Sequence, residues 1–218
     1  MKLFKTTNQK STKSIVIEFY SPDETHPPAI EHELLSNSEI GAKLRNEKQQ
    51  TVRYIYALND PIIEGINDLT VINLADDDNL HAFANSINQG DSLTILAQGD
   101  KDTQTVAGYS AEEFVEILQI DLGLRGLHTV ELFAAHIGHC TEFRETVVNS
   151  LNCAEHFITY KGIPTANETG ICGFVEDDSE MSDEDEEKTL RFLGAADLDE
   201  IRVVEKSEAV IYGFGVGS

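Results

Sequence analysis

Basic residues are scarce in this sequence. Its 218 residues include 16 Lys and Arg against 39 Asp and Glu, which gives a formal net charge of −23. A field of this sign repels phosphate backbones and anionic lipid surfaces, so the charge argues against nucleic acid or a membrane as the main partner. A basic protein partner is compatible with it, and so is simple solubility.

Cysteines and long apolar runs are also few. The three cysteines, Cys140, Cys153 and Cys172, are odd in number and form no CxxC pair. They therefore make no disulfide framework, and they fit a reducing compartment. No stretch approaches the roughly 20 apolar residues of a membrane span, and the Lys-bearing residues 1–13 lack the apolar core of a secretory signal. We expect a cytoplasmic protein, and no motif points to a cofactor or a metal.

The length and the hydrophobic fraction of 40% are those of one ordinary globular domain. We expect residues 1–13 to be a flexible N-terminus and residues 14–218 to be a single α/β domain. Residues 176–187 hold nine acids in twelve positions and cannot bury a core. An acidic loop or disordered insert is therefore expected at about 176–188.

Apolar runs that alternate with amphipathic stretches predict the fold. Strands are expected at 14–20, 51–58, 69–74, 92–98, 129–135 and 156–160, and helices at 29–48, 76–87, 110–122 and 141–152. The run 92–98 alternates too little to be half exposed, which predicts a strand covered on both faces. This order favours an α/β fold with a mostly parallel central sheet and helices on both faces. Two further apolar runs, 200–206 and 209–215, predict a C-terminal β-hairpin.

Two strand ends carry the residues that bear on function. In a parallel sheet, ligands and chemistry gather at the carboxyl ends of the strands. Those ends are Gln98-Gly99-Asp100 and Ala135-His136. A histidine at the first end and a cysteine at the second would form a dyad, in which the imidazole deprotonates the thiol and the thiolate attacks a carbonyl.

The segment around these ends resembles a known family. The stretches "LAQGD", "AGYSAEEF" and "ELFAAHIG", within about 93–138, resemble the autoprocessing cysteine-protease domains of large bacterial toxins, which are relatives of the caspases. Those domains typically show a strand ending in His-Gly, then Gly-Tyr-Ser-Ala-x-Glu at a helix start, and a later strand ending in the nucleophilic Cys. The resemblance implies a caspase-like fold with a ligand cleft at Gln98, Gly99, Asp100, Ala135 and His136.

The positions that would carry the family's chemistry are substituted. Gln98 stands at the histidine position and cannot titrate near neutral pH, and Ala135 at the cysteine position has no nucleophile. We therefore predict a pseudo-peptidase that binds a protein partner, with a basic partner as one hypothesis. Delivery into a host cell as a bacterial effector rests on the resemblance alone.

The family's activator is not expected to bind. The toxin domains respond to inositol hexakisphosphate through a basic pocket, whereas this chain carries six cations against 18 acids from Ala135 onward. A polyanion would meet a net charge of −12 in that half of the sequence.

The segment "HIGHC" offers an alternative chemistry. His136, His139 and Cys140 fall at i, i+3 and i+4, on one face if the segment is helical. A helix that begins near Thr141 would lower the pKa of the Cys140 thiol. The alternative is thus an active cysteine peptidase or hydrolase that uses Cys140 with His136 or His139. A zinc site formed by these three groups, which would need a fourth ligand or an open water position, and a plain turn with a covered thiol remain open.

Overall fold

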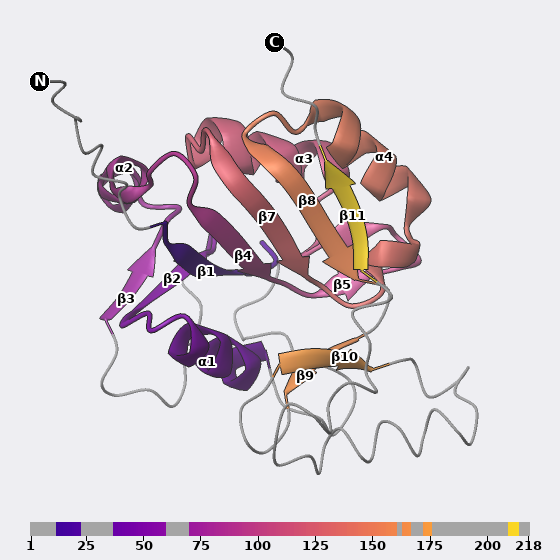
Figure 1. The fold of residues 1–218 in the computed structure, drawn as a ribbon, viewed down its shortest axis with the longest axis horizontal. Helices are drawn as coiled ribbons and strands as arrows, with labels where there is room; N and C mark the ends of the chain where they lie inside the picture. The colour runs from indigo at the N-terminus through magenta and orange to yellow at the C-terminus, as the bar shows by residue number, and fades with distance from the viewer. Residues whose placement is uncertain are drawn as a thin grey trace, which may run out of the picture.

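The protein, seen here in a computed structural model, is built around one large twisted sheet (Figure 1). The structure describes residues 12–22, 37–59, 70–160, 163–166, 172–175 and 209–213. The predicted flexible N-terminus, up to residue 11, and the predicted acidic insert at 176–188 lie outside the described residues.

Among the described residues, seven strands form the sheet in the order β11-β8-β7-β4-β1-β2-β3. Six of them are parallel, and β11 runs antiparallel to β8 at one edge. Their bounds are Ser14–Phe19 for β1, Val52–Tyr56 for β2, Thr70–Asn73 for β3, Ser92–Leu96 for β4, Leu127–Phe133 for β7, Ala154–Tyr160 for β8 and Ala209–Gly213 for β11. The predicted α/β fold with a mostly parallel sheet is confirmed and is consistent with a caspase-like arrangement. Strands from the first 90 residues belong to the same sheet as the rest.

Helices cover both faces of the sheet, as predicted. The helix α1, Asn37–Glu47, covers one face, which we call the α1 face. The other face, which we call the α3 face, is covered by α2 at Asp77–Ser86, α3 at Ala111–Glu116 and α4 at Thr141–Ser150. A π-helical turn, Ile117–Asp121, continues α3.

The core of the α3 face is aromatic and aliphatic. Phe114 of α3 packs between Phe19 of β1 and Phe143 of α4, with ring centroids 5.9 and 5.8 Å away. Burial of one such ring stabilises the fold by about 2–3 kcal/mol. Ser110 and Glu113 form a capping box, so α3 begins at a fixed point after the loop from β4.

The core of the α1 face contains an ion network. Glu18 of β1 is 3% exposed and accepts hydrogen bonds from Arg45 of α1 and, at 2.6 Å, from Arg53 of β2. The Tyr20 hydroxyl also donates to Glu18, at 3.3 Å. Gly41 leaves room for the network, because a Cβ there would lie 3.0 Å from Arg45 Nη1 and closer still to the Glu18 carboxylate.

Two short hairpins are not predicted by the sequence. β5, Gly99–Asp100, pairs with β6, Thr105–Val106, and β9, Ile163–Ala166, pairs with β10, Cys172–Val175. Of the helix expected at 29–48, the first eight residues lie outside the described part. The first arm of the expected C-terminal hairpin also lies outside it, so that hairpin stays a prediction. Within the described ranges, no helix is long and apolar enough to cross a membrane.

Candidate functional site

The two predicted strand ends meet at the carboxyl edge of the sheet. β4 and β7 are parallel neighbours in a register that pairs Leu96 with Phe133, and the Ala97 amide donates to the Phe133 carbonyl at 3.0 Å. Gly99 then passes directly over Ala135: a Cβ on Gly99 would lie 2.9 Å from the Ala135 nitrogen and closer still to its carbonyl oxygen. Only glycine fits so close an approach between two backbones. The sequence-predicted cleft residues are therefore brought together.

A tight turn follows Gln98, and the Asp100 carboxylate is hydrogen-bonded to the backbone of that turn. The exposed Gln98 accepts a hydrogen bond at its carbonyl from the Ala107 amide, 2.7 Å away, which closes the β5–β6 hairpin. The Asp100 carboxylate accepts from the amides of Thr103, at 3.1 Å, and Asp102, at 2.8 Å. These bonds, chiefly that from Thr103, lower the pKa of Asp100. Its carboxylate thus holds the turn in place.

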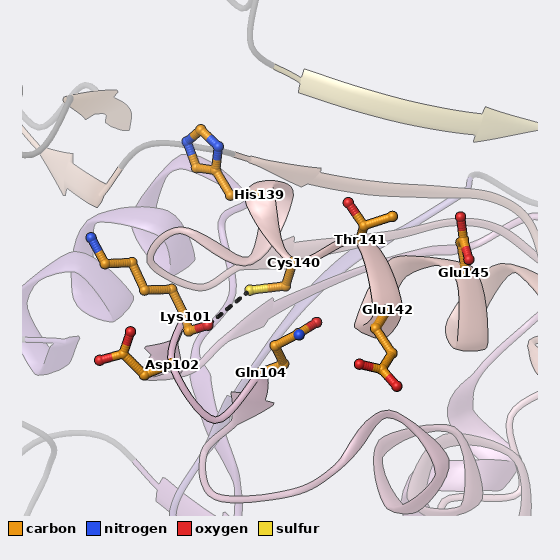
Figure 2. Close-up of a pocket in the computed structure, with 8 residues that line it drawn as sticks. All are labelled: Lys101, Asp102, Gln104, His139, Cys140, Thr141, Glu142 and Glu145. Carbon is orange, nitrogen blue, oxygen red and sulfur yellow. Dashed lines mark hydrogen bonds between the residues drawn. The ribbon is translucent and has the colours of Figure 1, made fainter.

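The predicted helical face of "HIGHC" does not form. His136 has a left-handed backbone with φ 60°, and only Ile137–His139 form a short 3₁₀ turn before α4 begins. His136, His139 and Cys140 therefore do not lie on one α-helical face. His139 is exposed, and Figure 2 shows its ring directed away from the Cys140 sulfur. The helical arrangement considered for the three side chains does not form, because the chain makes a sharp turn between β7 and α4. The geometry matches the other alternative, a plain turn with a covered thiol.

Cys140 is covered and is not activated. Its side chain is buried, and its sulfur lies 3.9 Å from the Lys101 carbonyl oxygen and 3.8 Å from that of His136. Burial raises the pKa of the Cys140 thiol, and the nearby Asp100 carboxylate adds to this, while Arg144 offsets part of it. The expectation that the start of α4 lowers this pKa is therefore wrong, because the loss of hydration dominates.

A groove of about 750 Å³ opens beside the two strand ends (Figure 2). Its walls are the β5–β6 turn and the start of α4, with the lining residues Lys101, Asp102, Gln104, His139, Cys140, Thr141, Glu142 and Glu145. Three exposed carboxylates and one ammonium face it, so the groove is acidic. The Gln104 side-chain oxygen accepts from the Phe143 amide at 3.3 Å, which holds the turn against α4.

Most residues of this groove, all except His139 and Cys140, were not predicted from the sequence. Gln104, Glu142 and Glu145 belong to the loop after β4 and to the first turns of the helix after β7. The sequence did contain a signal for these residues. Both segments connect the end of a strand to the following helix, and ligand sites gather at such connections in parallel sheets. Glu142 and Glu145 are not part of a nucleophile motif, so such a motif does not select them.

A metal site at "HIGHC" is not supported by the geometry. Among the residues that the structure describes, His136, His139 and Cys140 do not form a group close enough to share an ion. The group that does is His128, Glu155 and His156.

Comparison with protein families and with curated proteins finds no match for the chain.

Proposed function

We propose that this protein is a caspase-like binding protein without cysteine-peptidase chemistry, and that its acidic groove takes a basic segment of a protein partner. The single observation that carries the proposal is the composition of the groove. At the place where this kind of sheet binds its ligands, Asp102, Glu142 and Glu145 face the open space with Lys101 as the one opposing charge in its lining.

At the two described strand ends, the lack of a base and an ionised thiol supports binding rather than hydrolysis. Gln98 and Ala135 offer neither a base nor a thiol, and burial raises the pKa of the neighbouring Cys140. A thiol must ionise before it attacks a carbonyl. The rival function, a hydrolase that uses Cys140 with His136 or His139, needs a thiolate that this environment disfavours.

Charge gives the groove a preference for cations. Each exposed ion pair contributes only about 0.2–1 kcal/mol, so one contact does not make a binding site. Several carboxylates around a concave surface steer a cationic segment and fix its register, and their effect is sensitive to salt. The net charge of −23 adds a long-range attraction of the same sign.

Binding of a fluorescein-labelled hexa-arginine peptide to the full chain tests the groove. The double variant Glu142→Lys/Glu145→Lys reverses two charges in the groove. Glu112→Lys/Glu116→Lys makes the same charge change on the exposed side of α3. We expect the groove variant to weaken binding about tenfold, equivalent to about 1.4 kcal/mol, and the α3 variant to weaken it much less.

Equal weakening by both double variants would mean that the peptide responds to overall charge, and the proposal would be abandoned. The variant Ala135→Trp locates the contact more finely, because it places a bulky side chain where the two strand ends meet. We expect it to weaken binding if the peptide extends from the groove to the strand ends at Gln98. Unchanged binding would confine the contact to the acidic groove. Inositol hexakisphosphate itself is expected not to bind the chain, which titration without the peptide checks.

We also propose a reducing compartment for the protein, since Cys140 and Cys153 are both free and buried. Delivery into a host cell is the finer proposal, and it rests on the resemblance to toxin domains. A translocation reporter fused to the full chain tests it: reporter signal inside host cells supports delivery, and its absence under secreting conditions contradicts it.

A further inference from the structure

Two histidines and a carboxylate gather at the amino ends of β7 and β8, the opposite end of these strands from the groove. His128 is the second residue of β7, and Glu155 and His156 are the second and third residues of β8. The parallel register pairs Leu127 with Ala154 and Thr129 with His156, which sets His128 beside Glu155.

The three side chains are close enough to share one ion. Their candidate ligand atoms all lie within 4.8 Å of one another. His128 Nδ1 lies 2.8 Å from a Glu155 carboxylate oxygen, and the two imidazole rings meet edge to face with centroids 5.0 Å apart. The arrangement depends on the register between β7 and β8. It is therefore more than a chance cluster of surface acids or a lone histidine.

His156 also carries a ring nitrogen that lacks a partner. His156 Nδ1 is buried from solvent and makes no hydrogen bond. A buried polar atom without a partner is costly, and such atoms are rare in folded proteins. A bound cation at His156 Nδ1 would satisfy that nitrogen directly.

We propose that His128, Glu155 and His156 bind a divalent transition-metal ion, with Zn²⁺ as the ion. Two imidazole nitrogens and one carboxylate oxygen are a set that zinc accepts, with water in the fourth position. The same set disfavours Mg²⁺ and Ca²⁺, which prefer oxygen ligands throughout.

The side chains can close on an ion without movement of the strands. Tetrahedral ligands about 2.0–2.1 Å from zinc stand about 3.3 Å apart, less than the 4.8 Å limit within which the three groups lie. His128 and Glu155 are 54% and 52% exposed, so their side chains are able to rotate inward. The ion would then tie the first residues of β7 to those of β8.

Titration of the metal-free full chain with zinc chloride, in competition with a chromogenic chelator, tests the site. We expect one equivalent of zinc to bind. His128→Ala and His156→Ala should each weaken zinc affinity by more than roughly 10–100-fold, which is the cost of losing only a hydrogen-bond partner of a metal ligand. His139→Ala and His81→Ala are the matched controls, since neither belongs to the cluster, and they should leave the affinity unchanged. Because protons compete for the imidazoles, binding should also weaken in acid.

Thermal stability and the spectrum of bound Co²⁺ give two further tests of the proposal. Zinc at a hundredfold excess over its Kd should raise Tm by about 5–10 °C in a chain of this length. Co²⁺ should give the visible bands of a tetrahedral site, and His128→Ala, whose altered side chain is exposed and should not disturb folding, should abolish both effects. Equal zinc affinity in His128→Ala and in the unaltered chain would overturn the proposal. Loss of binding on His139→Ala would overturn it too, and would place the ion at "HIGHC".

Discussion

The two faces of the sheet are closed in different ways. On the α3 face, Phe19, Phe114 and Phe143 interlock in an apolar core, whereas on the α1 face Glu18 is buried between two arginines. Apolar contacts are non-directional and tolerate changes that conserve volume. A buried ion network depends on every member, because removal of one leaves the others uncompensated in a medium of low polarity. The α1 face therefore adds specific charged partners to the apolar contacts of Ile40 and Leu44, whereas the α3 face holds its helices mainly by volume.

Removal of Glu18 should have the largest effect. Glu18→Ala leaves Arg45 and Arg53 buried at 2% and 0% exposure without their shared carboxylate, and we expect it to lower the free energy of unfolding by about 3–5 kcal/mol. Equilibrium unfolding in urea measures this. Glu47→Ala is the control, since its pair with Lys48 lies on the surface and contributes about 0–1 kcal/mol. Similar losses in both variants would show that the buried network contributes no more than a surface ion pair, and the contrast drawn between the two faces would lose its basis.

A cavity on the α3 face should cost less. Val147 of α4 is fully buried, and Val147→Ala removes two carbon atoms from the core. We expect a loss of about 2 kcal/mol, the sum of transfer and cavity contributions, which corresponds to a fall in Tm of about 4–8 °C in a chain of this length. Val148→Ala, on the same helix but only half-buried, should lower Tm by less. A larger fall for Val148→Ala would contradict the packing described for α4.

The chemistry of Cys140 should give the smallest effect. The thiol belongs to the core of the α3 face, and its raised pKa keeps it neutral at pH 7. Alkylation by iodoacetamide, followed by mass spectrometry at a series of pH values, should be slow until the pH exceeds the ordinary thiol pKa. Cys153, whose pKa burial raises to about 11, should react more slowly still.

Arg144→Gln sharpens this measurement. The Arg144 charge lowers the pKa of Cys140, so its removal should slow alkylation, by less than about threefold because a partly exposed charge is screened. Rapid alkylation of Cys140 near pH 7 would instead support the hydrolase that uses Cys140, and would justify a search for its substrate.

The larger elements could be predicted from the sequence because their signals are local. The apolar run 92–98 lies in β4, covered on both faces, and Ser110 with Glu113 marks the start of α3. The β5–β6 hairpin could not be predicted in this way, since strands of two residues have no periodicity to detect.

The details of the sites depended on tertiary structure. The left-handed backbone of His136 and the burial of Cys140 follow from how the chain turns between β7 and α4, which no local pattern specifies. The approach of His128 to Glu155 and the meeting of Glu18 with Arg53 need the register between strands distant in sequence. The composition of the groove was visible in the sequence, but its walls were not.

The position of β11 has a consequence for folding. The strand completes the sheet by pairing with β8, and residues 161–208, which are 48 in number, separate the two strands. The entropy lost in bringing the two ends of so long a segment together must be offset by contacts that form only afterwards. Such distant pairings therefore form slowly. Until β11 arrives, the outer edge of β8 presents unpaired amides and carbonyls to any other extended chain, which is the condition that promotes aggregation. During synthesis, the chain is thus most prone to self-association just before β11 emerges.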